Sequence, residues 1–450
     1  MSILKNLTGA LSSYQRHLNE VLQLIASSDS VPLLVEYSRD GSGYVREAVL
    51  ARCVALARPE LLAVVAERLN DWVPQVRSAA RTALVALLPF VPAPQLMVAL
   101  PAILRLHSGG RGDYAAWLEE FEQILLQSVT VDDIRAAATG NDLQAARAAV
   151  HLLDKHALFE PAAVIELILH RSDDIVLALQ GADMCRRLPP AQREALYRVA
   201  SHSHFGAVRT LAMRALLSTL GDDRLEIAIA ALMDKQSSVR HTAAHYLVAQ
   251  GFDVAAHYRG LLEQGDATVK RLQMSLIMLA ALRDVASLEL VQSFVHSAYP
   301  ALRLTALSAW FKMSERDKDA IALTAMHDAS PRVRKFAVQL VLRHGAYIPF
   351  SAILQQLAVS EDVVLVMQLA ETNRWNWLEC AARVCLQRGV DEARRLGMGK
   401  AFAEWFASPQ WQSNSDHEQR FLLLSEPVIS AFGQLLSPQQ LAGLREQLLR

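Results

Sequence analysis

The sequence predicts an all-α fold in which pairs of helices stack into an extended α-solenoid. A chain of 450 residues is too long for one compact core, so it should form several domains or a repeat array. Apolar residues make up 52% of the chain and aromatic residues only 6%, a composition dominated by Ala, Leu and Val that suits closely packed helices. Glycine and proline number only 19 and 16, which leaves little material for long loops. A motif that recurs along the chain then favours the array.

The recurring motif is a polar turn, then Val-Arg or a near equivalent, then Ala and Leu at helical spacing. YVREAVLARCVAL from Tyr44 and SVRHTAAHYLV from Ser238 are clear copies. The basic residue returns at successive gaps of 31, 132, 31, 30, 33 and 31 residues, and the long gap is about four periods. Copies that keep their phase in this way indicate a true internal repeat. The basic residues are Arg46, Arg77, Arg209, Arg240, Lys270, Arg303 and Arg334.

Each part of the motif has a physical reason. Val239, Ala243 and Leu247 are four residues apart, which gives the helix one apolar stripe. An acid six residues before the Arg lies in the turn that starts the helix, where it can cap free N–H groups and meet the positive end of the helix dipole. Another apolar helix precedes each turn. A repeat is therefore helix A, turn and helix B, and neighbouring repeats must stack to bury both helices. The acids are Asp40, Asp71, Asp234 and Asp328.

This pattern resembles the HEAT-repeat family, whose repeats carry an Asp in the turn and Val-Arg at the start of the second helix. The resemblance covers roughly residues 30–372 and implies a right-handed α-solenoid of about eleven stacked helix pairs. It also implies that the Asp and Arg residues form a ladder along the stack, interrupted where copies vary, as at Lys270. The residues that it makes structural are Asp71, Arg77, Asp234, Arg240, Asp328 and Arg334.

We expect three segments: residues 1–28 as an N-terminal capping helix, 29–372 as the repeat solenoid and 373–450 as a helical C-terminal cap. Inside the solenoid, the glycine-rich run HSGGRGD before Tyr114 matches no phosphate loop and is expected to be a flexible turn.

The C-terminal segment is rich in tryptophan. These side chains are expected to cover the last apolar face of the stack. An exposed aromatic binding surface is the alternative, because tryptophan is enriched in binding hot spots. The tryptophans concerned are Trp375, Trp377, Trp405 and Trp411.

Charge, cysteine content and hydropathy indicate the class of protein and the compartment in which it works. The formal charge is −1, from 45 basic and 46 acidic residues, which excludes a globally basic nucleic-acid coat protein but not a local patch. The four cysteines form no CxxC pair and are expected to be small buried groups in a reducing compartment. The longest apolar stretch, 272–282, is shorter than the ~20 residues that span a membrane. We expect a cytoplasmic protein of bacterial style that contacts no membrane.

The sequence predicts no enzyme, no cofactor and no metal site. His241 and His245 lie four residues apart on one helix, but a zinc protease would need Glu where Thr242 stands. His202 and His204 occur one repeat earlier, so a four-histidine metal cluster is conceivable. Solvated helix histidines are the interpretation that we favour.

One face of the helix B series is basic. Counting from the Val or Leu that starts each helix B between residues 205 and 344, positions two, six and ten further on share a polar-leaning face. This face holds no acid, and it also holds uncharged residues such as Thr210, Ser275 and Leu279. Its seven basic residues are the candidate partner-binding residues. They are Arg214, His241, His245, Arg271, Lys312, Lys335 and Arg343.

Two functions compete for this face. A scaffold that holds a protein partner, in particular an acidic segment, fits the long concave surface that the family resemblance implies. Nucleic-acid binding, as in HEAT-like DNA glycosylases, is the alternative, although seven basic residues over five helices are a thin footprint for a polyanion. A solvated face whose sign is accidental also stays open. The oligomeric state is not predicted.

Overall fold

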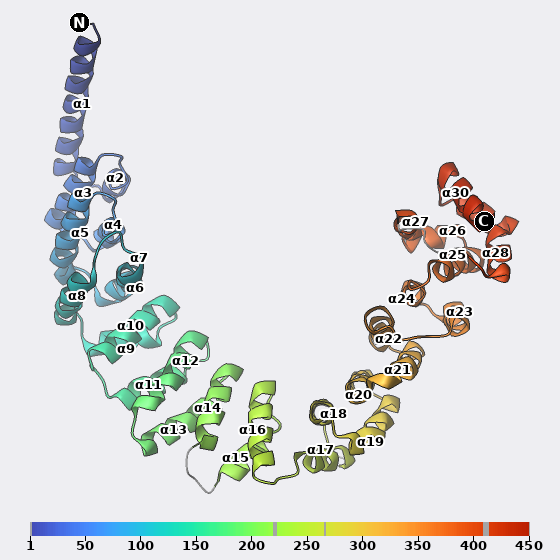
Figure 1. Ribbon diagram of the computed structural model, residues 1–450. Coiled ribbons are helices and arrows are strands. Elements are labelled where there is room, and N and C mark those ends of the chain that lie inside the picture. Colours follow the sequence, from blue (N-terminus) through green and yellow to red (C-terminus); the bar gives the residue numbers. More distant parts are fainter. Residues whose placement is uncertain (1, 219–222, 265–266, 408–413, 450) are drawn as a thin grey trace. The chain divides into compact units, whose positions relative to one another are not determined.

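The computed structural model describes residues 2–218, 223–264, 267–407 and 414–449, with side chains from Gln15 onward. Throughout these ranges the regular secondary structure is helical and no strand occurs. The chain divides into two compact units, Met1–Tyr246 and Leu247–Arg450, each built of antiparallel helix pairs (Figure 1). The predicted all-α solenoid is therefore confirmed. The count of eleven pairs and the boundaries at residues 28 and 372 stay predictions.

The first unit begins with one long helix and continues as helix pairs. Successive helices contact each other as hairpins, for example α9 with α10 and α13 with α14. Its α-helices are α1 (Ser2–Ser27), α2 (Val31–Tyr37), α3 (Gly43–Leu56), α4 (Leu62–Arg68), α5 (Pro74–Leu87), α6 (Ala93–Leu104), α7 (Leu106–Gly109), α8 (Ala115–Ser128), α9 (Val131–Thr139), α10 (Leu143–Lys155), α11 (Pro161–Leu169), α12 (Ile175–Met184), α13 (Pro190–Ser201), α14 (Gly206–Ser218), α15 (Arg224–Ala231) and α16 (Ser237–Ala249). Its short 3₁₀ helices are η1 (Pro59–Leu61), η2 (Leu88–Phe90) and η3 (Cys185–Arg187).

The second unit continues with the same hairpins and ends in a cluster of shorter helices. Its α-helices are α17 (Val254–Glu263), α18 (Val269–Leu282), α19 (Leu288–Ser293), α20 (Pro300–Met313), α21 (Lys318–Met326), α22 (Pro331–His344), α23 (Phe350–Val359), α24 (Val363–Leu369), α25 (Arg374–Arg388), α26 (Val390–Arg395), α27 (Met398–Ala407), α28 (His417–Leu424), α29 (Glu426–Gly433) and α30 (Pro438–Leu449). Its 3₁₀ helices are η4 (Val285–Ser287), η5 (Phe294–His296) and η6 (Glu315–Asp317).

The Asp–Arg ladder links neighbouring repeats. Arg46 donates two hydrogen bonds of 2.8 Å to Asp71 in the turn of the next repeat, and a third to the carbonyl of Asp40 in its own turn. Asp71 also accepts from the N–H of Val73, which closes the turn before α5; among the described residues, no side chain caps the first turn of that helix. One carboxylate thus closes a turn and bridges two repeats. The same bidentate pairs join Arg209 to Asp234 and Arg303 to Asp328.

Electrostatics in the ladder favour ionised carboxylates. Burial alone raises the pKa of Asp71, but the hydrogen bonds from Arg46 and Val73 outweigh burial and lower it below its usual value. Asp234 and Asp328 shift in the same direction for the same reasons. The structural interpretation of the ladder residues is therefore confirmed where the next turn carries an Asp.

The regular stack changes at α6. This helix contacts α4, the first helix of the preceding pair, as expected. It also packs directly on α10 and α9, so its next neighbour in the stack is α10, which is the second helix of the α9–α10 pair. Figure 1 shows α2, α4 and α6 on the side that α10 and α12 then occupy. Among the residues that the structure describes, Arg77 donates only to the carbonyls of Asp71 and Trp72, because no turn aspartate faces it across this change.

The glycine-rich run before Tyr114 is anchored, which corrects the expected flexible turn. It contains the short helix α7, and the buried hydroxyl of Tyr114 donates to the carbonyl of Leu69. Asn70 accepts from the N–H of Arg111. A Cβ on Gly110 would come within 2.5 Å of the Tyr114 ring, so glycine is required for this close approach. The run therefore ties the change at α6 to the end of α4.

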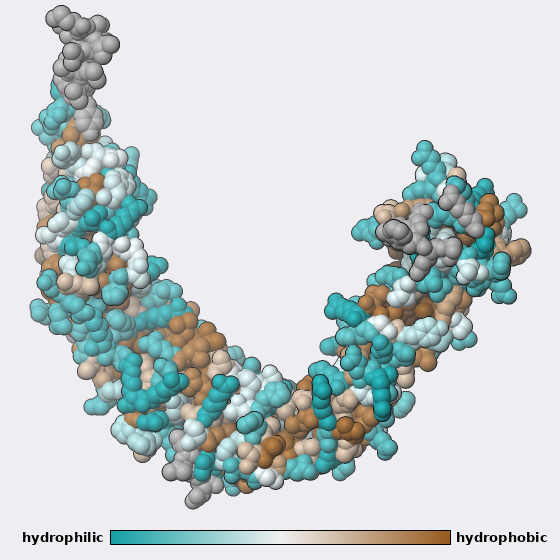
Figure 2. Space-filling view, in the orientation of Figure 1, coloured by the Kyte–Doolittle hydropathy of each residue, from teal (hydrophilic) through white to brown (hydrophobic). Residues whose placement is uncertain are grey.

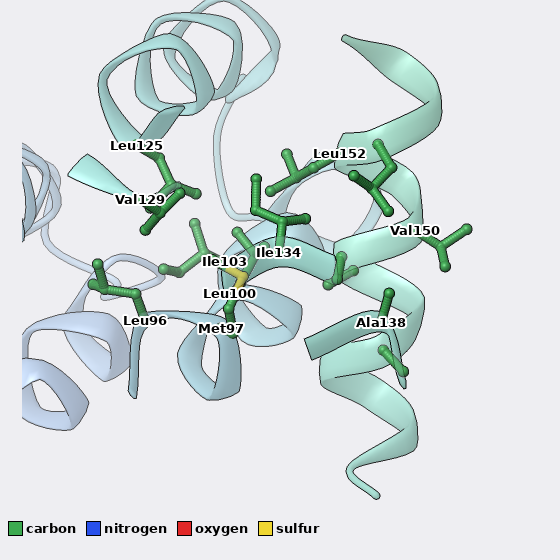
Figure 3. Packing of buried hydrophobic residues seen from close by; sticks show 14 of the residues in the cluster. Leu96, Met97, Leu100, Ile103, Leu125, Val129, Ile134, Ala138, Val150 and Leu152 are labelled. Carbon is green, nitrogen blue, oxygen red and sulfur yellow. The ribbon is translucent and has the colours of Figure 1, made fainter. Parts of the chain in front are cut away.

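The core of the first unit runs through the change at α6. Figure 3 shows Leu100 and Ile103 of α6 facing Ile134 of α9 and Leu152 of α10, all of them buried. Because these four residues belong to three different helices, they bury apolar surface across the irregular junction. The junction is thus held by its core as well as by the ties at Tyr114.

The C-terminal tryptophans are core residues in the described ranges. Trp375 and Trp405 pack edge to face, with ring centroids 5.7 Å apart, and Trp377 packs edge to face on Phe402, with centroids 5.4 Å apart. Each of the three tryptophans is less than 10% exposed. Their burial favours the covering role over an aromatic binding surface. Trp411 lies outside the described residues.

The four cysteines are free and buried, as the sequence indicated. Burial raises the pKa of Cys53 and Cys380 to about 12, and that of Cys185 and Cys385 to about 11. Among the described helices, we found none with the length and apolar content that a bilayer crossing needs.

Candidate functional site

Three of the predicted basic residues line one hollow of the first unit. Arg214 of α14 and His241 and His245 of α16 border an open hollow of about 560 Å³, together with small hydroxyl residues of α16. All three basic side chains are exposed. They come together because α14 and α16 are the second helices of successive repeats, so equal positions on them lie side by side.

Arg214 also borders a second hollow of about 560 Å³, which α13 and α14 enclose. Arg186 of η3 and Arg193 and Tyr197 of α13 line its other side. Among the described residues, no Asp or Glu lines either space. We call the two spaces together the basic hollows.

Hydroxyl groups fix the packing beneath the basic hollows. Thr210 and Ser238 share a hydrogen bond of 2.7 Å between α14 and α16, and Thr210 also donates to the carbonyl of Gly206. Thr242 donates to the carbonyl of Ser238. These hydroxyls therefore have partners within the protein, and the basic side chains are the groups that face solvent.

The guanidinium groups of the second hollow differ in the partners that they already have within the protein. Arg193 donates twice to the carbonyl of Leu188, which holds it against the end of η3. Arg186 forms an ion pair of 3.2 Å with Asp183, but both side chains are about two thirds exposed, so this pair contributes little. Among the described residues, Arg214 has no carboxylate partner. Arg214 is therefore the cation of these hollows most available to a bound carboxylate.

The other four predicted residues lie in the second unit. Arg271 lies on α18, Lys312 on α20, and Lys335 and Arg343 on α22, and all four side chains are exposed. Because they belong to a separate unit, one continuous groove over residues 205–344 stays a prediction. The positions counted along the sequence also assigned three residues to the exposed polar face that the structure buries, so the prediction is wrong for these three. Thr210, Ser275 and Leu279 are buried because helices of adjacent repeats cover them.

The four histidines considered for a metal cluster are divided between two places. His202 and His204 line a separate hollow at the turn before α14, whereas His241 and His245 line the hollow on α16. Within the described ranges, no group of three or more His, Cys, Asp or Glu side chains is placed to hold a metal ion.

Sequence reasoning missed one charged cluster, between α8 and α10. Glu122 of α8 is only 2% exposed, and it lies 2.8 Å from Lys155 Nζ and 2.6 Å from His156 Nε2. His151 Nε2 lies 3.8 Å from the other carboxylate oxygen. Burial alone raises the pKa of Glu122, but these three basic groups outweigh burial and lower it to about 2. His151 on α10 and His156 just after its end were the only sequence signal, and their partner lies 29 or more residues away.

Apolar surface is also exposed on the first unit. On α12, Ile175 and Val176 are 43% and 50% exposed. The space-filling view shows hydrophobic surface in the region of α12 (Figure 2). A second apolar hollow of about 740 Å³ lies between α4 and α6, where alanines such as Ala63 and Ala99 leave space. The first unit therefore also offers exposed aliphatic surface.

Comparisons with known proteins found one short family match and several solved structures. The family model described as a HEAT repeat associated with sister chromatid cohesion matches residues 55–80, from the end of α3 into α5. No curated protein matches the chain.

Several solved structures are similar at low identity. The YibA protein of E. coli is similar over 73% of this chain and 97% of its own, with 12% identity and a TM-score of 0.22. Kap95p, in a structure of its binding to RanGDP, is similar over 94% of this chain and 69% of its own, with 10% identity and a TM-score of 0.35. A chain of the S. pombe condensin Cnd3–Cnd2 subcomplex is similar over 96% of this chain and 66% of its own, with 13% identity and a TM-score of 0.29. The chain is therefore an α-solenoid with an Asp–Arg ladder, and its repeat at residues 55–80 matches the HEAT-repeat model.

Proposed function

We propose that the chain is a non-catalytic protein-interaction scaffold whose basic hollows hold an acidic segment of a partner protein. The observation that carries the proposal is the acid-free lining of the two hollows, which share Arg214. An acidic segment would place carboxylates against Arg214 and Arg193, where charge-assisted hydrogen bonds form. Complementary charge would also speed the encounter with the partner.

The exposed aliphatic residues of α12 support a protein partner rather than a polyanion. Ile175 and Val176 are exposed on the helix that precedes α13 and α14 along the chain. Protein interfaces combine an apolar centre with a polar rim, whereas phosphate backbones are bound through charge. We propose that Arg271, Lys312, Lys335 and Arg343 of the second unit serve the same acidic partner.

The test is a comparison of two labelled probes by fluorescence anisotropy. One is a peptide of alternating Glu and Leu residues, and the other is a 20-base-pair duplex DNA. The variant carries Arg214→Glu, His241→Glu and His245→Glu together. We expect the wild type to bind the peptide, and the variant to bind it at least 10-fold more weakly because a carboxylate then faces a carboxylate.

The matched control carries Arg316→Glu and Lys400→Glu, at side chains that are 86% and 87% exposed away from the hollows. It should bind the peptide like the wild type. Tighter binding of DNA than of peptide, with the steep salt dependence of phosphate neutralisation, would favour the nucleic-acid alternative and overturn the proposal. A pull-down from native lysate with and without nuclease then identifies the natural partner.

A further inference from the structure

A hollow of about 580 Å³ lies where the stack changes at α6. Residues of α6, α7, α8 and α10 line it, so it exists only because α6 packs on α10 at this junction. Part of its wall is apolar and comes from Pro101 and Leu104 near the end of α6, Leu118 of α8 and Ala148 of α10. Small-molecule sites have this character: a mostly apolar concavity of roughly 300–1,000 Å³ with a few polar groups.

Some charged side chains that line this hollow form ion pairs within the protein, and others do not. Lys155 is held by Glu119 at 2.7 Å and by Glu122 at 2.8 Å, and Arg147 is held by Asp174 at 2.8 Å. These pairs satisfy both acids of the lining. Of the other basic groups in the lining, His151 lies 3.8 Å from Glu122, and Arg105 and His107 remain.

The two basic residues at the α6–α7 end are open to a ligand. Arg105 and His107 are exposed, and among the described residues neither has a carboxylate partner. Arg105 donates only to the carbonyl of Pro101, at 3.3 Å, which leaves its terminal nitrogens available. His151, half exposed, points from α10 at the Glu122 side of the hollow. An anion at the α6–α7 end therefore meets two basic side chains, Arg105 and His107, that have no carboxylate partner among the described residues.

We propose that this hollow binds a small organic carboxylate with an aliphatic or aromatic body. The carboxylate lies against Arg105 and His107, and the body lies against Pro101, Leu104, Leu118 and Ala148. Glu122 is a positioning residue: its bonds to Lys155 and His156 hold α10 against α8 and so fix the wall of the hollow. This site is separate from the basic hollows and does not depend on the proposed function.

Isothermal titration calorimetry with octanoate, 2-naphthoate and octylammonium tests the proposal on the full chain. We expect saturable binding of one equivalent of each carboxylate and no comparable binding of octylammonium. Arg105→Gln with His107→Gln removes two exposed donors without touching the core and should weaken carboxylate binding at least 10-fold.

Two bulky variants locate the site. Gln144→Trp obstructs this hollow, whereas Gln95→Trp obstructs the apolar hollow between α4 and α6. Both positions are exposed, so helicity and melting temperature should match the wild type. Carboxylate binding should be lost in Gln144→Trp and kept in Gln95→Trp. The proposal is overturned by the opposite pattern, by octylammonium binding as tightly as octanoate, or by absence of saturable carboxylate binding in the wild type.

Discussion

Replacing Arg46 by methionine tests whether the ladder holds the repeats together. Arg46 and Asp71 have side chains that are 0% exposed, and Arg46 also donates to the carbonyls of Asp40 and Gly41. Removing one member of a buried ion pair costs ~3–5 kcal/mol, because it leaves the other charge buried. Asp71 keeps bonds from Arg68 at 3.2 Å and from the Val73 N–H at 2.9 Å. We therefore expect the lower end, about 3 kcal/mol.

The assay must be local, because each repeat of a solenoid contacts only its neighbours. Native-state hydrogen exchange, read by mass spectrometry, gives the free energy of opening for amides of α2 to α5. These amides should lose about 3 kcal/mol of protection in Arg46→Met, while amides of α13 to α15 should keep theirs. The control is Arg39→Met at an exposed pair, where the side chains of Arg39 and Glu67 are 66% and 43% exposed and the expected cost is about 0–1 kcal/mol.

The pH dependence of Arg46→Met has a defined sign. The pKa of Asp71 in the folded protein lies below its ordinary value of 3.8, so its ionised form stabilises the fold above that pH. The difference between wild type and Arg46→Met should be constant from about pH 5 to 8 and shrink as pH falls below the ordinary pKa. Replacing both partners, as Arg46→Met with Asp71→Leu, should recover part of the loss. Equal protection in Arg46→Met and Arg39→Met would refute this account of the ladder.

Three further predictions concern the first unit and the cysteines. Glu122→Gln should lose about 1.5–3 kcal/mol of stability at neutral pH, measured by urea unfolding, since hydrogen bonds to a charged group are lost. Because the pKa of Glu122 is about 2 in the fold against 4.5 ordinarily, this difference should persist above about pH 4.5 and vanish as pH falls through about 2. A Cβ at Gly181 would lie 3.1 Å from Ile168, so Gly181→Val should lower stability by about 1–3 kcal/mol in the same assay; no loss would contradict the close packing of α11 on α12. At pH 8, dithiobis-nitrobenzoate should react slowly with the thiols of the native protein, and it should label all four thiols once guanidinium unfolds the chain. Fast labelling of the native protein would contradict the burial of the cysteines.

The ladder was predictable because it depends on local spacing. An Asp six residues before an Arg defines a turn and the first helical residues, and the sequence shows both. The bridge from Arg46 to Asp71 follows once the repeat stacks on its neighbour, since the same 25-residue separation recurs from Arg209 to Asp234. The burial of the C-terminal tryptophans followed from the need to cover the last apolar face.

The site was only partly predictable, because it depends on packing between helices. Counting along the second helices found Arg214, His241 and His245. It did not find Arg186 and Arg193, which line the second hollow beside Arg214 from η3 and α13. The cluster at Glu122 joins α8 to the C-terminal end of α10, and no motif in α8 predicts that contact. Spacing fixes which residues share a helix face, whereas neighbouring helices decide which part of that face stays open.

The regularity of the repeat also separates structural from binding residues. Arg209 and Arg303 occupy equal positions and make the same bidentate pair, so these positions cannot distinguish one part of the surface from another. Recognition must use positions where the repeats differ. Arg214 is such a position, because the equivalent residue of α20 in the second unit is Ser308. Arg209→Met should therefore lower the stability of its own repeats, with peptide affinity falling only in step with unfolding. Arg214→Met should lower peptide affinity and leave stability within about 0.5 kcal/mol.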